Sequence, residues 1–236
     1  MTTSNRPQPI GPIVDAHSAK RPERITLKGR WITLVPLDAE AHAKDLFKGS
    51  NGDAERERVW SYLFNGPFDT LAEFGADVEL KAKTVDPNYF AILDNASGRA
   101  VGYASLMRID PPNRVIEVGG IMYTPAMQHT PGATEAQYLL ARYVFEELDN
   151  RRYEWKCNAL NAPSRRAAER FGFTFEGIFR QHMIVKGRNR DTAWFAMLDN
   201  EWPERKAAYE RWLKPDNFDD EGRQKTRLSD LMPRTT

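Results

Sequence analysis

The sequence predicts an α+β protein in which antiparallel strands pack against helices. Three apolar segments in the middle of the chain alternate strand-forming residues and are separated by turn signals at 95–98 and 110–113, which is typical of antiparallel hairpins. These segments are YFAILD, RAVGYASLMRID and NRVIEVGGIMYT. Helical patterns stand on both sides of them, and residues 117–150 pass from an apolar strand through a polar loop into a long helix.

The first part of the chain reads as an arm, a strand and three helices. Residues 1–24 carry four prolines and are expected to form an extended arm. Strand formers follow around Gly29, and the strand ends at Pro36. Helices are expected at 39–50, within 53–68 and at 70–83, the second of them capped by Asp53 and closed by Asn65 and Gly66.

The last part of the chain alternates strands and helices. After the long helix that ends near residue 150, the pattern predicts a strand, a short helix, one or two strands, a further strand and a helix, over 151–160, 163–171, 172–187, 190–202 and 203–213. The remainder is polar and is expected to be peripheral. We divide the chain into an arm (1–24), a folded domain (25–200) and a C-terminal helix with a polar tail (201–236).

Composition excludes several classes of function. The 236 residues suit one domain, and a net charge of +1 argues against a general nucleic-acid binder. No apolar run approaches the roughly 18 to 20 residues of a membrane span, and the N-terminus lacks an apolar signal core, so a cytoplasmic protein is expected. One cysteine and four histidines give no metal-ligand cluster, so no metal site is expected.

The strand, loop and helix of residues 117–150 have the layout of an anion site. The loop 128–134 contains both Pro131 and Gly132, and the helix follows directly. Such a turn points backbone N–H groups and the positive end of a helix at a phosphate. Many strand-to-helix turns with one glycine bind nothing, so the pattern leaves both interpretations open.

Two motifs resemble those of the GCN5-related N-acetyltransferase (GNAT) family. The first is Gln128 to Ala133 ahead of the long helix, and the second runs from Asn161 through Ser164 to the Gly-Phe pair at 172–173. The resemblance covers about residues 25–200. Within the family, the chain is similar to the ribosomal-protein-serine and -alanine N-acetyltransferase branch, on the segments ATEA, NAPSRRAAERFGF and FEGIFRQHMIVKGRNRDTAWFAML. It implies a mixed, mostly antiparallel sheet of six to seven strands with helices on both faces.

The resemblance also implies acetyl-CoA as cosubstrate, without a metal, and names the residues that hold it. The pantetheine arm would lie along Ile121, Met122 and Tyr123, and Asn161 would bond its amide. The pyrophosphate would meet the loop N–H groups of Gln128, His129, Thr130, Gly132, Ala133 and Thr134. Ser164 would protonate the leaving thiolate. Pro131 departs from the family pattern, because it stands in place of the first loop glycine and has no N–H.

The general base is a second departure from the family. Many relatives use a Glu and a Tyr at positions that are Lys156 and Ala168 here. Glu117, at the start of the strand facing the acetyl group, and His182 are the remaining candidates, since either side chain could accept a proton. The alternatives are that Glu117 pairs with a strand neighbour such as Arg114, and that His182 is a surface or core histidine.

The first functional hypothesis is an N-acetyltransferase in which a primary amine, of a small molecule or a protein N-terminus, attacks acetyl-CoA directly. The alternatives are a non-catalytic acyl-CoA sensor on the same fold and a structural subunit. No nucleic acid or membrane is expected as a partner, and a homodimer is possible.

Two further groups of side chains have two interpretations each. Aromatic residues could wall a substrate cleft, although such spacing is more often core: Trp60, Tyr62, Phe64, Phe68, Trp155 and Trp194. The basic residues Lys186, Arg188 and Arg190 indicate first a solvated hairpin turn, and second a contact for the coenzyme or an acidic substrate.

Overall fold

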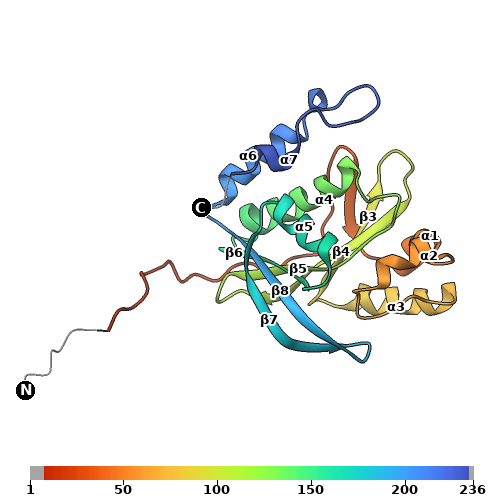
Figure 1. Ribbon diagram of the computed structural model, residues 1–236, viewed down its shortest axis with the longest axis horizontal. Coiled ribbons are helices and arrows are strands. Elements are labelled where there is room, and N and C mark those ends of the chain that lie inside the picture. The colour runs from red at the N-terminus through yellow and green to blue at the C-terminus, as the bar shows by residue number, and fades with distance from the viewer. Residues whose placement is uncertain (1–7, 234–236) are drawn as a thin grey trace, which may run out of the picture.

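The computed structural model describes residues 8–233 and folds them around one eight-stranded sheet (Figure 1). The strand order is β1-β2-β3-β4-β5-β6-β8-β7, and every neighbouring pair is antiparallel except β5 and β6. The strands are β1 Leu27–Lys28, β2 Ile32–Pro36, β3 Asn88–Asp94, β4 Ala100–Asp110, β5 Val115–Tyr123, β6 Arg152–Asn158, β7 Thr174–Val185 and β8 Arg188–Leu198.

The predicted fold class is confirmed, and the predicted strand count is too low. The segment around Gly29 forms two strands, because the chain reverses there and the Gly29 N–H donates to the Ile32 carbonyl at 2.9 Å. Residues 172–187, expected to form one or two strands, form the single strand β7.

The helices flank the sheet in two groups. They are α1 Ala39–Ser50, α2 Ala54–Glu57, α3 Leu71–Lys83, α4 Pro131–Arg142, α5 Ala162–Arg170, α6 Trp202–Trp212 and α7 Leu228–Leu231, with single turns at Arg58–Trp60, Tyr143–Glu147 and Pro215–Asn217. One apolar core joins α4, α5 and α6 to one face of the sheet, and a second joins α1 and α3 to the other face. Figure 1 shows α1–α3 grouped at one side and α4–α7 at another.

The helix predicted over 53–68 is wrong beyond Trp60. Asp53 caps its start as expected, but regular helix ends at Trp60. The Trp60 indole is buried against Phe68 and Phe74 and donates to the Ser50 carbonyl at 2.7 Å. Packing of this large ring therefore outweighs the local helical pattern, and residues 61–68 form an irregular segment.

The two ends of the chain are held differently. The described part of the arm, 8–24, contains no helix or strand, and its main chain bonds to the body at Ala19 and Lys20; residues 1–7 lie outside the described residues. The prediction of a peripheral tail is wrong for Leu228, which is fully buried in the main core, and for Phe218, which packs on Trp31 and Trp212. Apolar residues spaced along a polar segment therefore anchor it.

Within 8–233, none of the helices combines the length and apolar character that a membrane crossing requires.

Candidate active site

The sheet is opened between β5 and β6. These two strands pair in parallel only from Val115 with Arg152 to Val118 with Trp155. Beyond that point β5 continues to Tyr123 beside β4, and β6 continues to Asn158 beside β8. The facing edges of β5 and β6 therefore carry backbone N–H and C=O groups that the described sheet does not pair across the opening, which suits an extended ligand with amide groups.

A bulge at Gly119 and Gly120 marks the start of the opening. The register of β4 with β5 shifts there, and Gly120 has φ +57°. A Cβ on Gly120 would lie 3.0 Å from the Tyr89 hydroxyl, so a side chain there would be both crowded and strained. Burial raises the pKa of Tyr89 to about 12, so this hydroxyl keeps its proton near neutral pH.

The three residues predicted to accompany the pantetheine arm lie on the far side of this bulge. Met122 is fully buried against α1 and α3, and Ile121 and Tyr123 are half-buried on the other face. The Tyr123 hydroxyl accepts from Gln137 at 2.6 Å, and burial raises its pKa. Their side chains are thus committed to the core, and only their main chain faces the opening.

Several backbone N–H groups of the loop before α4 already bond to acceptors near the loop. The N–H groups of Gln128, Thr130 and Ala133 bond to the Thr124 carbonyl, the Met127 carbonyl and the Thr130 hydroxyl respectively. Those of His129, Gly132 and Thr134 have no acceptor in the described chain. Three of the six predicted donors therefore remain for an anion at the positive end of the helix.

Pro131 and Gly132 have structural reasons for their positions. Pro131 occupies the first position of α4, after the Thr130 cap, where its missing N–H breaks no helical bond. A Cβ on Gly132 would lie 2.7 Å from Cγ2 of Ile32, so the glycine lets α4 sit closely on β2. The Gln128 side chain donates to the Tyr123 carbonyl at 2.8 Å and closes the loop.

A cation that the sequence analysis did not single out stands at the first turn of α4. Arg170, at the end of α5, donates to the hydroxyl of Thr134 at 3.0 Å and lies over the rings of Phe171 and Trp212. Burial lowers its pKa. Its only signal in the sequence is its position in the AERFGF motif.

Asn161 and Ser164 lie together at the start of α5. The Asn161 side chain accepts from the Ser164 N–H at 3.2 Å and caps the helix. The Ser164 hydroxyl accepts from the Trp155 indole at 3.0 Å and lies beside Cys157, whose pKa is raised by burial. Both residues adjoin the β6 side of the opening.

A buried network of charges covers the other face of the sheet at the opening. Glu117 Oε2 contacts Arg108 at 2.6 Å and Lys156 at 2.9 Å, and Lys156 also contacts Glu154 at 2.6 Å. The network continues through Arg152, which binds Glu154 and Glu176. The suggested partner Arg114 is wrong, because it precedes β5 and binds Asp149 instead.

His182 lies on β7 beside this network. It is exposed, its Nδ1 atom is 2.9 Å from the Thr192 hydroxyl, and its ring is 6.0 Å from that of Trp194. Lys156 Nζ lies 3.8 Å from the centre of the Trp194 ring, so Trp194 separates His182 from the charges. The Trp194 indole N–H is buried and has no acceptor in the described chain.

An irregular segment and a hairpin enclose this face. Lys186, at the turn between β7 and β8, donates to the carbonyls of Trp60 and Gly66 at 2.9 and 2.7 Å. The Tyr62 hydroxyl donates to the Leu160 carbonyl at 3.2 Å. Of the aromatic residues considered for a cleft, Trp60 and Trp155 belong to the core, whereas Tyr62 and Phe64 are exposed.

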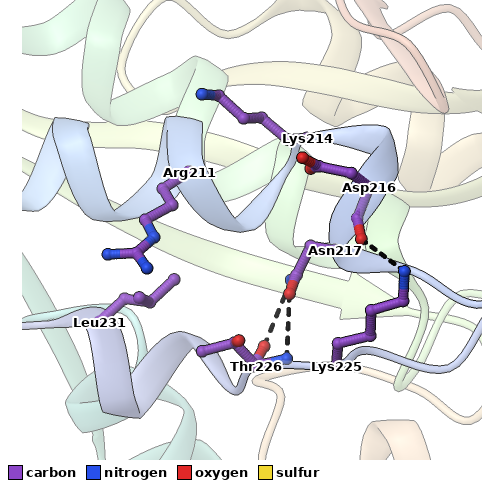
Figure 2. A pocket seen from close by; sticks show the side chains of 7 residues that line it. All are labelled: Arg211, Lys214, Asp216, Asn217, Lys225, Thr226 and Leu231. Carbon is purple, nitrogen blue, oxygen red and sulfur yellow. Dashed lines mark hydrogen bonds between the residues drawn. The ribbon is translucent and has the colours of Figure 1, made fainter.

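A separate cavity of about 260 Å³ lies in the C-terminal segment (Figure 2). Asn217 bonds Thr226 twice within it, and Lys225 donates to the Asp216 carbonyl at 2.9 Å, so its polar groups largely serve one another. It contains none of the predicted site residues, and Lys214 points away from Asn217 and Thr226. Nor do 8–233 contain a group of three or more side chains that could hold a metal ion.

Comparisons with known proteins agree on one family. The family model described as an acetyltransferase (GNAT) domain matches residues 32–174. A solved GCN5-related N-acetyltransferase from Brucella melitensis is 52% identical, with a TM-score of 0.89 over 91% of this chain and 97% of that one. A structure from Chromobacterium violaceum, described as a probable acetyltransferase (GNAT family), is 37% identical, with a TM-score of 0.76 over 85% and 100% of the two chains.

A curated relative from Bacillus subtilis (strain 168) carries the name "Putative ribosomal N-acetyltransferase YdaF". It is 28% identical over 189 residues, which cover 76% of this chain and 94% of the relative.

Proposed function

Because the chain belongs to the acetyltransferase (GNAT) family, we propose that it transfers an acetyl group from acetyl-CoA to a primary amine by direct attack. The resemblance to the GNAT family drawn from two sequence motifs is confirmed, and the name of a relative that is 28% identical supports its ribosomal-protein branch. The observation that supports this reaction best is the opening between β5 and β6, with the first turn of α4 at one side and that of α5 at the other. The name of YdaF supports keeping a protein N-terminus among the acceptors worth testing.

The residues present fit the coenzyme. The unpaired edges of Gly119–Tyr123 and 156–158 would hold its amide groups, and the Asn161 side-chain amide adds a donor. The N–H groups of His129 and Gly132, with the Arg170 guanidinium, would hold the pyrophosphate. When bound, the coenzyme supplies an acetyl thioester activated for attack by an amine.

Candidate proton acceptors and proton donors for the reaction lie on both sides of the opening. Glu117 Oε1, the oxygen not engaged by Arg108 or Lys156, would lie 3.3 Å from a Cβ at Gly119, so it faces the bulge. It can accept the proton of the amine directly or through water, and His182 is the second candidate. The hydroxyls of Ser164 and Tyr89 keep their protons and can supply one to the leaving thiolate.

A thiol-release assay with a panel of amines tests this proposal. With the best acceptor, we expect Glu117→Gln or His182→Ala to lower kcat by about 100-fold or more, the usual contribution of a general base. The rate across pH identifies which of the two acts. Unchanged turnover in both variants would remove both candidates, and calorimetric binding of acetyl-CoA without turnover of any amine would show a sensor in place of an enzyme.

A further inference from the structure

Arg190 is a buried cation without a carboxylate. It is 8% exposed, and its Nε atom donates to the Thr192 hydroxyl at 3.2 Å. Its guanidinium lies 5.3 Å from the centre of the Phe64 ring. Within the described chain no acidic side chain pairs with it, and burial lowers its pKa, an effect that the nearby Cys157 and Glu117 oppose. A buried charge in this state lacks the anion that would offset its desolvation.

The surrounding charges are already matched. The three carboxylates of the network, Glu117, Glu154 and Glu176, are each bound by at least one of Arg108, Lys156 and Arg152. Asp191, the next residue on β8, points to the other face and accepts from the Gln181 N–H and the Asn189 amide. Arg190 therefore adds a positive charge that this part of the protein leaves unbalanced.

Arg190 faces the acceptor side of the opening. β8 pairs regularly with β6, so side chains at 190, 192 and 194 share one face with Lys156, which is paired with Trp194. Segment 60–68 lies over the same face, through Phe64 on Arg190 and Lys186 on the Trp60 carbonyl. The loop before α4 and Arg170 adjoin the opposite core, so Arg190 is not placed for the pyrophosphate.

We propose that Arg190 binds a carboxylate of the acceptor, so that the substrate is a small amine carrying a carboxylate, of the amino-acid type. This inference rests on the proposed function and narrows its acceptor. The bond from Nε to Thr192 and the contact with Phe64 fix the plane of the guanidinium, which leaves Nη1 and Nη2 to bind a carboxylate in a bidentate manner. A polyamine places positive charge against the same group and is disfavoured.

The test compares acceptors that differ only in the carboxylate. Thiol release is measured with amino acids, their carboxamides and the corresponding decarboxylated amines, with spermidine and phosphoethanolamine as further arms. For the preferred amino acid we expect kcat/KM to exceed that of its amide by about 10- to 100-fold, the usual effect of a charge-assisted hydrogen-bond pair. A preference for the amide, for spermidine or for phosphoethanolamine would overturn the inference and leave the acetyltransferase proposal standing.

Variants of Arg190 distinguish a role in binding the acceptor carboxylate from a role in folding. Arg190→Gln should raise KM for the amino acid by about tenfold or more, with KM for acetyl-CoA and for the amide unchanged, and Arg190→Lys should restore part of the loss. Arg188→Gln, an exposed change two residues earlier on β8, is the matched control. If no amine releases thiol, the proposed function fails, and binding alone then tests the role of Arg190. Amino acids are titrated by calorimetry into the coenzyme A complexes of wild type and R190Q. Binding that is lost in R190Q supports Arg190 as the carboxylate site, whereas equal binding in both proteins, or none in either, overturns the inference.

Discussion

The two faces of the sheet meet the opening between β5 and β6 with different chemistry. On the face of α4 and α5, the groups at the opening are backbone N–H groups, helix ends and small side chains. On the face of α1 and α3, they are six charged side chains in one ion-pair network, with Arg190 beside it. Backbone groups suit the amides and phosphates of the proposed coenzyme, whereas the charged side chains suit the recognition of a charged acceptor, as we propose for Arg190.

The largest expected effect is on the charged face. Lys156→Met removes the cation that Glu117 and Glu154 share. Breaking a buried pair costs up to about 3–5 kcal/mol of unfolding free energy, and the remaining bonds to Arg108 and Arg152 place the expected loss toward the lower end. Urea unfolding measures the loss. The matched control is Lys83→Met in the exposed pair with Glu79, where about 0.5 kcal/mol or less is expected. Similar losses in both variants would show that the network is not the stabilising feature of this face.

A smaller effect is expected on the other face. Arg170→Gln removes the cation at the first turn of α4, and we expect acetyl-CoA binding to weaken about tenfold, because a charge-assisted bond to phosphate is lost. Calorimetry measures the affinity, with Arg166→Gln as an exposed control on the same helix. Since we propose that the acceptor binds on the other face, its KM should stay constant. A change confined to that KM would contradict the division between the faces.

The smallest effect is expected from an exposed charge pair far from both faces of the opening. His17 binds Asp15 and Asp149, and the bond with Asp149 raises its pKa above the usual value. Because the folded pKa is raised, the stabilisation is fully present below pH 6.5 and is lost as pH rises through the folded pKa. The melting temperature of His17→Ala should therefore fall below that of wild type at acidic pH and approach it at alkaline pH. A difference independent of pH would assign the effect to packing.

Much of the fold could be predicted because local signals agree with it. Asp53 caps its helix as predicted, and the hairpins of β3, β4 and β5 follow the turn residues. The failures have tertiary causes. Burial of Trp60 ends a helix early, and Leu228 anchors a segment whose composition is polar.

In the candidate site, too, local features could be predicted and features with tertiary causes could not. The loop before α4 and the start of α5 were predictable, because short motifs encode backbone geometry. The partners of Glu117 were not, since Arg108 and Lys156 reach it only through the pairing of β4 and β6 with β5. Arg190 could be identified as basic, but its burial depends on Phe64, which is 126 positions away in the chain.

The bonds from Lys186 to the carbonyls of Trp60 and Gly66 couple two parts of the protein that are distant in sequence. Any widening of the space between the β7–β8 turn and segment 60–68 has to break both bonds of a single ammonium group. The β7–β8 turn and segment 60–68 therefore stay together unless this one side chain lets go of both carbonyls.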